Sequence, residues 1–135
     1  MLEKFFNKKI FRDIFKLHPL RESFNYAIKG IVYLFLFHRN MRIIFLSGIL
    51  AVVLSIYLKL TRVEFAVLLV TISVVFVAEM FNTAIELIID MFTDKYHTLI
   101  KIIKDISAGV VLIACLNAVL IGYLLFFKKI IVLIK

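Results

Sequence analysis

The sequence predicts an all-α membrane protein with three transmembrane helices and an amphipathic helix near its N-terminus. Of the 135 residues, 64% are hydrophobic and the mean hydropathy is +1.06, whereas soluble domains are roughly 45–50% apolar. One proline and four glycines leave little chain for turns or flexible linkers. The single cysteine, Cys115, lies in an apolar run and excludes a disulfide framework. We therefore expect one small helical domain in a bilayer.

The first 42 residues have the pattern of helices that lie at a membrane surface. Hydrophobic side chains recur on one stripe of the first helix, at Leu2, Phe6, Ile10 and Ile14. Lysine and arginine cover another face, which is typical of an interfacial amphipathic helix. Pro19 ends this helix, and residues 23–42 indicate a second one. No cleavable signal peptide is expected, because the first long apolar run begins near residue 43.

Three apolar stretches follow. The first is Ile43–Leu58, flanked by Arg42 and Lys59, and it is short for a span. The second begins near Val63. The third, Ile106–Phe127, has 22 uncharged residues, which make about 33 Å of helix and are enough to cross a bilayer. This pattern divides the chain into an interfacial region, a transmembrane domain and a basic tail, at residues 1–42, 43–127 and 128–135.

Positive charge is concentrated before the first span. Nine lysines and arginines lie there, two lie in the first loop, three in the second loop and three in the tail. This excess predicts a cytoplasmic N-terminus and second loop, and a C-terminus outside, although the tail lysines argue against it. The net charge is +8. Because basic residues flank the apolar segments, we expect anionic lipid headgroups as partners and no nucleic acid.

The second span ends in an acidic stretch. At 100° per residue, Glu79, Asn82, Glu86 and Asp90 fall within an 80° stripe of one helix. A carboxylate in the middle of a membrane costs roughly 3 kcal/mol on insertion scales. The stripe must therefore face another helix, water or a metal ion. The simplest interpretation is contact between helices or a position beyond the membrane.

A catalytic interpretation explains why two carboxylates, Glu79 and Glu86, lie two turns apart with an amide between them. One can act as general base toward a hydroxyl at membrane depth, and another can hold a hard divalent cation. A kinase acting on a lipid alcohol needs both functions. Lys104 and Asp105 precede the third span, where a lysine could pair with phosphate and an aspartate could hold an adenine amine or a ribose hydroxyl. Lys104 alone is typical of a lysine at a helix end. The chain has no GxxxxGK motif, so side chains must hold any nucleotide.

Two sequence blocks resemble a known family. ExxNTAIExxxD, from Glu79, and KYHxLxKxxKDxxAGxVL, from Lys95, are similar to the prokaryotic diacylglycerol kinase and undecaprenol kinase family, and the similarity extends from about Ser23 to Phe127. The resemblance implies a lipid kinase of the bacterial inner membrane that uses ATP and Mg²⁺. It also implies a homotrimer, with a site shared between protomers near the cytoplasmic face.

The resemblance also implies residue roles. Glu79 matches the base that takes the proton from the lipid hydroxyl, Glu86 matches a metal-holding carboxylate, and Asn82 matches an amide that shapes the site. The positions matching nucleotide-contacting residues are Tyr26, Lys95, Tyr96, His97, Lys104 and Asp105. Ala108 and Gly109 resemble positions where helices approach closely.

His38 departs from the family pattern. The family usually has glutamate there, as the second metal carboxylate. Histidine offers a nitrogen, which Mg²⁺ disfavours. Either Glu86 holds the ion with phosphate and water, or a metal such as Mn²⁺ is used, or activity is weak. Recruitment of Glu22 is a further option.

The sequence leaves open which lipid is the phosphate acceptor, and it leaves alternatives to the lipid kinase function open as well. HRNMR and LTRVEF resemble the undecaprenol kinases more than the enterobacterial diacylglycerol kinases. His38 also allows a degenerate family member that binds lipid or nucleotide without transferring phosphate. A proton-coupled transporter using Glu79 would need acidic residues in more than one span, and the first and third apolar stretches have none. A purely structural membrane subunit is the remaining alternative.

Overall fold

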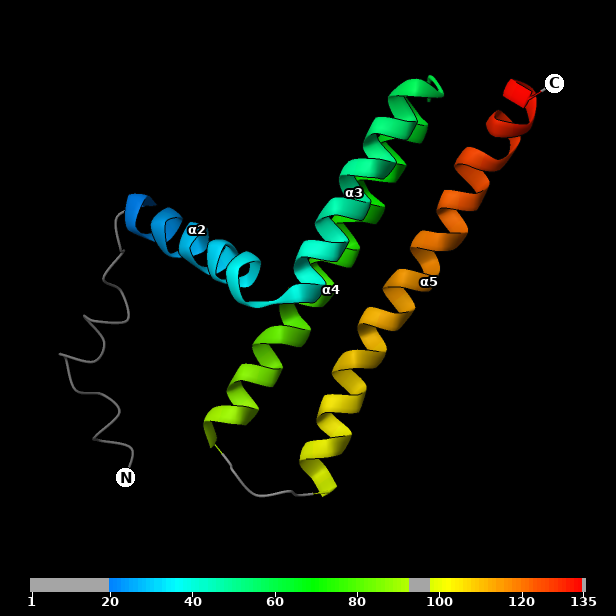
Figure 1. The fold of residues 1–135 in the computed structure, drawn as a ribbon. Helices are drawn as coiled ribbons and strands as arrows, with labels where there is room; N and C mark the ends of the chain where they lie inside the picture. Colours follow the sequence, from blue (N-terminus) through cyan, green and yellow to red (C-terminus); the bar gives the residue numbers. More distant parts are fainter. Residues whose placement is uncertain (1–19, 93–97, 135) are drawn as a thin grey trace, which may run out of the picture. The chain divides into compact units, whose positions relative to one another are not determined.

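Residues 20–92 and 98–134 are described by a computed structural model, in which every regular element is an α-helix. The helices are α2 (Leu20–Phe37), α3 (Arg39–Tyr57), α4 (Arg62–Phe92) and α5 (Thr98–Ile134), as Figure 1 shows. The all-α prediction is confirmed. The amphipathic helix predicted before Pro19 lies outside the described residues. Two compact units are found, one that contains α2 and one that begins at His38; the second is called the three-helix unit below.

The three helices α3, α4 and α5 are each long and apolar enough to cross a membrane, which confirms the three predicted spans. They have 19, 31 and 37 residues, or roughly 28, 46 and 55 Å of helix. The first span is therefore close to the roughly 30 Å of a hydrocarbon core. The first span predicted from apolar residues alone, Ile43–Leu58, was too short. Helix α3 begins four residues before Ile43, with Arg39 in its first turn.

The bounds predicted for the second interfacial helix, residues 23–42, were wrong. The helix α2 ends at Phe37, and His38 is extended, with φ −112° and ψ 114°. Residues 39–42 therefore belong to α3. No proline or glycine marks this break, and the polar residues Arg39, Asn40 and Arg42 that follow it were assigned to the end of the interfacial helix. In its first turns α2 is amphipathic, with Arg21, Asn25 and Lys29 within an 80° stripe.

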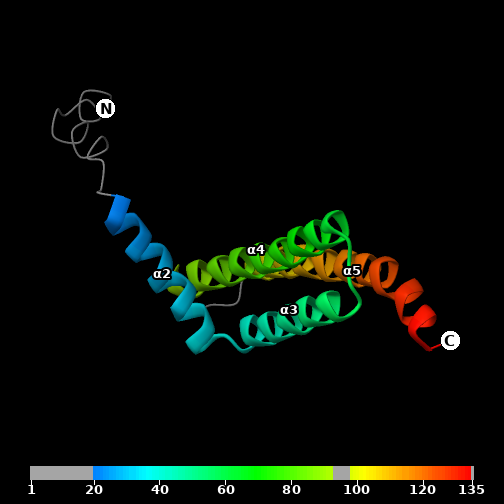
Figure 2. The same ribbon diagram turned by 90° about the horizontal axis from the view of Figure 1, so that it is seen from above.

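The three-helix unit is held together mainly by α4. Helix α4 packs along α5, and α3 packs against α4 (Figure 2). A small core joins them at Val75 and Ala78 of α4 and Ala114 of α5, with Ile44 of α3 packed against it. The free thiol of Cys115 is half-buried beside this core.

Helices α3 and α4 approach closely at Gly48. A methyl group built on Gly48 would lie 3.2 Å from Cγ2 of Ile72, so the glycine lets the two backbones come together. At Gly109, one of the two positions where a close approach was expected, a methyl group would meet nothing within 4 Å in the described chain, and Ala108 is exposed. The sequence block alone did not say which face of α5 meets a neighbour.

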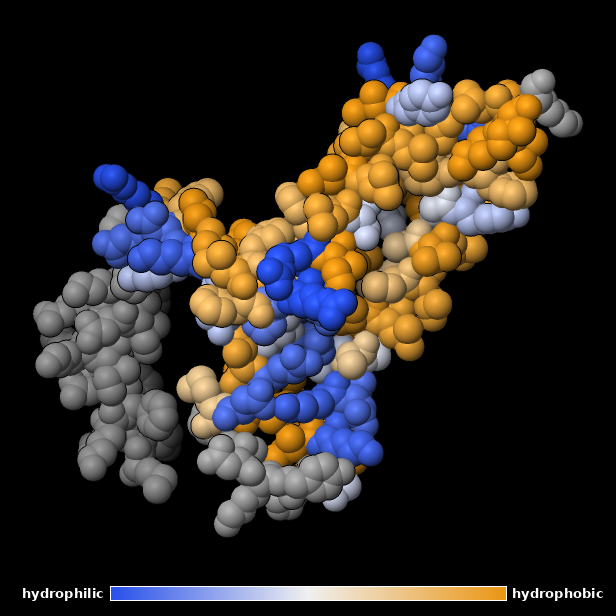
Figure 3. Space-filling model, viewed as in Figure 1, coloured by the Kyte–Doolittle hydropathy of each residue, from blue (hydrophilic) through white to orange (hydrophobic). Residues whose placement is uncertain are grey.

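Most apolar side chains of the three-helix unit are exposed, as expected for helices whose solvent is lipid. Hydrophobic surface covers most of the upper part of this unit in Figure 3, whereas hydrophilic residues gather toward the lower end, where α4 ends and α5 begins. This polar end carries the acidic stripe.

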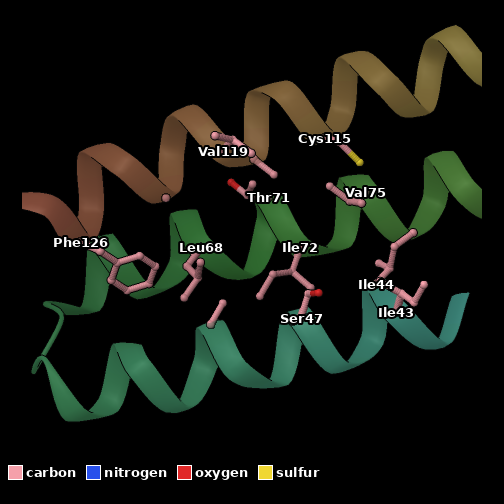
Figure 4. A pocket seen from close by; sticks show the side chains of 14 residues that line it. Ile43, Ile44, Ser47, Leu68, Thr71, Ile72, Val75, Cys115, Val119 and Phe126 are labelled. Atoms are coloured by element: carbon pink, nitrogen blue, oxygen red, sulfur yellow. The ribbon is translucent and has the colours of Figure 1, made fainter. Parts of the chain in front are cut away.

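An apolar groove runs along α4 between α3 and α5 (Figure 4). Its volume is about 370 Å³. Ser47 and Thr71 supply the only hydroxyl groups among the described residues that line it, and the Thr71 hydroxyl donates to the carbonyl of Val67 at 2.8 Å. The lining is otherwise hydrocarbon and the Cys115 thiol, so the groove suits an apolar chain.

Candidate active site

The acidic stripe of α4 changes from buried to exposed along the helix. Glu79 is 3% exposed and Asn82 is 8% exposed. Glu86, one turn further on, is half-buried, and Asp90 is exposed. The stripe predicted from helical periodicity therefore begins inside the three-helix unit and ends at its surface, as the cost of burying carboxylates requires.

Asn82 connects α4 to α5. The hydroxyl of Ser107 on α5 lies 2.8 Å from Oδ1 of Asn82, and Nδ2 of Asn82 donates to Oε1 of Glu86 at 3.2 Å. An ionised carboxylate only accepts hydrogen bonds, so the amide nitrogen faces Glu86 and the amide oxygen faces Ser107. The Ser107 hydroxyl therefore donates to Asn82. Ser107 also lies 2.9 Å from the carbonyl of Lys104.

A second connection between α4 and α5 lies nearer the surface. Nζ of Lys104 is 2.7 Å from Oδ1 of Asp90. Both side chains are partly exposed, so this ion pair contributes little to stability. Its effect is geometric, since it holds the Lys104 ammonium beside the end of the acidic stripe.

Glu79 is in a different environment. The residue is 3% exposed, and among the described residues its carboxylate has no hydrogen-bond or ion-pair partner. Thr83, one turn further along α4, is 1% exposed. A carboxylate that lies among apolar helices and makes no structural contact is a candidate for contact with a substrate.

The site therefore consists of a buried carboxylate, a second carboxylate oriented by an amide, and a lysine nearby. The sequence profile of prokaryotic diacylglycerol kinase matches residues 25–126, which is most of the chain. The chain belongs to the prokaryotic diacylglycerol kinase family. The resemblance drawn from the two sequence blocks is confirmed, and with it the class of enzyme, a lipid kinase.

Relatives within this family carry two different names. The diacylglycerol kinase of Synechocystis is 37% identical over 117 residues, which cover 85% of this chain and 67% of that protein. The undecaprenol kinase of Bacillus subtilis is 31% identical over 114 residues, covering 84% and 93%. The diacylglycerol kinase of Escherichia coli is 33% identical over 72 residues, covering 53% and 59%.

The remaining positions implied by the diacylglycerol kinase family are distributed over the chain. Tyr26 is exposed on α2, and Asp105 is exposed on α5 beside Lys104. Lys95, Tyr96 and His97 lie outside the described residues.

His38 is half-buried and stands immediately before α3, with no side-chain hydrogen bond that caps the helix. It begins the helix that packs on α4 through Ile44. Helix α3 runs antiparallel to α4, and His38 precedes Ile44 in the chain. His38 therefore lies beside the part of α4 that follows Ala78, where the acidic stripe begins.

The donor atoms of the stripe suit a hard cation. Among the described residues, Oε2 of Glu86 has no partner, while Oε1 accepts from Asn82. Mg²⁺ is commonly held by one or two carboxylates together with phosphate oxygens and water, and Glu86 fits that pattern. The described residues contain no group of three metal-ligating side chains.

Two contacts of the candidate site were not predicted from the sequence. Ser107 was passed over as part of an apolar run, and Asp90 was placed on the stripe without its lysine partner. The sequence signal for Ser107 was only a hydroxyl three residues after Lys104 on the same helix. Which side chain of α4 it meets depends on how the two helices pack.

Proposed function

We propose that this member of the diacylglycerol kinase family transfers the γ-phosphate of ATP to the hydroxyl of a membrane lipid, undecaprenol or diacylglycerol, with Glu79 as the general base. The observation that carries the proposal is the buried Glu79 carboxylate, one turn from the amide that orients Glu86. Family membership supports ATP as the phosphate donor.

The chemistry follows from what a hydroxyl needs in order to attack a phosphorus atom. As the lipid oxygen forms its bond to the γ-phosphorus, its proton moves to the Glu79 carboxylate. The bond from the γ-phosphorus to the bridging oxygen breaks, and ADP leaves. Glu79 lies within an apolar bundle and has no described partner that competes for the incoming proton. These features support its assignment as the base.

Glu86 is assigned to the metal ion. A bound Mg²⁺ or Mn²⁺ supplies charge neutralisation at the transferring phosphate. The chain's own residues orient the carboxylate: Asn82 donates to Glu86, and Ser107 holds Asn82 from α5. His38 would be a ligand that suits Mn²⁺ better than Mg²⁺, because it offers a nitrogen.

Nucleotide binding is assigned to positions that the family pattern implies. Lys104 would contact phosphate oxygens, and its ion pair with Asp90 holds it near Glu86. Asp105 would bind an adenine amine or a ribose hydroxyl. The other nucleotide-contacting positions in this proposal are Tyr26, Lys95, Tyr96 and His97.

We place the protein in the bacterial inner membrane as a homotrimer, with the N-terminus and the acidic end cytoplasmic and anionic headgroups around its basic flanks. The lysine and arginine excess before α3 supports the orientation. Self-association is supported by Asn117, an exposed amide within the apolar span of α5, because such amides hydrogen-bond across helices in membranes.

The hydrocarbon chain of the acceptor is assigned to the apolar groove of Figure 4. Val75 lines the groove and lies one helical turn before Glu79, or about 6 Å along the axis. A lipid whose hydroxyl reaches Glu79 can therefore lay its chain along α4. The groove's hydrocarbon walls support this assignment.

A phosphotransfer assay tests the proposal. Purified protein in mixed micelles receives labelled ATP with undecaprenol or diacylglycerol, under Mg²⁺ or Mn²⁺. Label on one of the lipids is expected and identifies the acceptor. Folded protein that labels neither lipid under either metal would overturn the proposal and favour a degenerate member.

A further inference from the structure

Lysines from two distant segments line one pocket at the end of the three-helix unit opposite the acidic stripe. Its volume is about 420 Å³. The lining includes Lys59 and Leu58 after α3, and Lys128, Lys129, Val132 and Leu133 near the end of α5. We call this the lysine pocket. One side of it is cationic, and the rest is mostly hydrocarbon.

The lysine pocket has an excess of positive charge. Lys129 is neutralised by Glu64 of α4, with Nζ 2.9 Å from Oε2. Lys59 and Lys128 have no ion pair or hydrogen bond to any side chain that the structure describes. Two ammonium groups in one pocket repel each other, and an anion bound between them removes that repulsion.

The turn that carries Lys59 is unusual. Lys59 has a φ of 51°, in the left-handed region that glycine normally fills at a helix end. The turn has the Schellman pattern, with the amide of Leu60 donating to Ser55 O and that of Lys59 to Ile56 O. A residue other than glycine costs about 1 kcal/mol in this conformation. Such strain points to a use for the lysine side chain.

The N-terminus of α4 holds this turn in place. The amide of Thr61 donates to Oε2 of Glu64 at 2.7 Å, and the amide of Glu64 lies 3.3 Å from the Thr61 hydroxyl, which is a capping box. The same Glu64 carboxylate binds Lys129. The α3–α4 turn and the end of α5 are thereby fastened together, and the lysine pocket is preformed.

We propose that the lysine pocket binds the headgroup of an anionic phospholipid in the leaflet opposite the acidic end. The phosphate would lie between the ammonium groups of Lys59 and Lys128, and the first carbons of the acyl chains would contact Val132 and Leu133. An amphiphile fits better than a free anion because much of the wall is apolar. Glu64 and Glu79 are 15 residues apart on α4, roughly 22 Å, so this lipid is not the phosphorylated one.

Native mass spectrometry of the detergent-purified full chain tests the proposal. Phosphatidylglycerol and phosphatidylcholine with the same acyl chains are added in turn to the wild type and to Lys59→Gln, Lys128→Gln and Arg62→Gln. Arg62 is exposed at the same end of the unit and is not among the pocket's lining residues, so its variant is the matched control. Helix content by circular dichroism confirms that each variant is folded.

The wild type is expected to retain phosphatidylglycerol in preference to phosphatidylcholine. Each pocket variant should weaken that retention about fivefold, since a lysine near an anionic lipid is worth about 1 kcal/mol, while Arg62→Gln should not. Equal loss in all three variants, equal retention of the two lipids, or displacement of phosphatidylglycerol by millimolar inorganic phosphate would overturn the proposal.

Discussion

Ser107 on α5 donates a hydrogen bond of 2.8 Å to the side-chain oxygen of Asn82 on α4. Both residues are buried, and the amide nitrogen of Asn82 is thereby directed at Glu86. A hydroxyl on one transmembrane helix thus sets the orientation of a carboxylate on another. The proposed roles of Glu79, Glu86, Lys104 and His38 lead to separate experiments.

Ser107→Ala should raise the metal concentration needed for half-maximal phosphotransfer by about fivefold, because a hydrogen bond contributes about 1 kcal/mol and its loss frees Asn82 to rotate. Titration of Mg²⁺ in the micelle assay measures this shift. Ser107→Thr keeps the hydroxyl and should restore the wild-type midpoint. A loss of stability with an unchanged midpoint would show that Ser107 only packs the helices.

Glu79→Gln should lower phosphotransfer by about 10²- to 10⁴-fold, the usual contribution of a general base, and should leave ATP binding intact. Turnover and ATP binding are measured on the same preparation. Glu64→Gln is the matched control on the same helix, since glutamine can keep the capping box, and it should retain turnover. Parallel loss of turnover and ATP binding in Glu79→Gln would reject the base assignment.

Asp90→Asn should raise the KM for ATP about fivefold while changing the unfolding free energy by less than about 1 kcal/mol, because the pair it breaks is partly exposed. Steady-state kinetics and thermal unfolding measure the two effects. The exchange Asp90→Lys with Lys104→Asp keeps the ion pair but moves the ammonium to α4. If the exchange restored the KM, Lys104 would have only a structural role.

His38→Glu should lower the Mg²⁺ concentration for half-maximal activity at least roughly tenfold, because it adds an oxygen ligand that Mg²⁺ prefers. Residues that only orient the ligands of a metal already contribute about that much. The Mg²⁺ and Mn²⁺ titrations are compared in the variant and the wild type. His38→Gln is the control, since it adds an uncharged oxygen. An unchanged Mg²⁺ midpoint in His38→Glu would remove position 38 from the metal site.

Ala51→Phe should reduce turnover of long-chain acceptors several-fold and leave short-chain acceptors unaffected, because Ala51 lines the apolar groove and a phenyl ring would fill part of it. Ala66→Phe is the matched control, because Ala66 is exposed and is not a groove residue. Equal effects on both acceptor lengths would place the lipid chain elsewhere.

Much of the architecture follows from local patterns. The three spans are apolar runs whose length matches a bilayer, and the stripe of Glu79, Asn82, Glu86 and Asp90 follows from 3.6 residues per turn. Both are properties of a single helix, so the order of residues along the chain determines them. The two family blocks likewise lie within continuous segments.

Contacts between helices could not be predicted in the same way. Ser107 is 25 positions from Asn82, and Lys104 is 14 from Asp90. The close approach at Gly48 also depends on how neighbouring helices fit together. The sequence by itself determined the helices, their spans and the carboxylates that one face of α4 carries, because hydropathy and helical period act within a segment. Only the tertiary structure decided which of those side chains meet, because that depends on the rotation and depth at which α4 packs against α3 and α5.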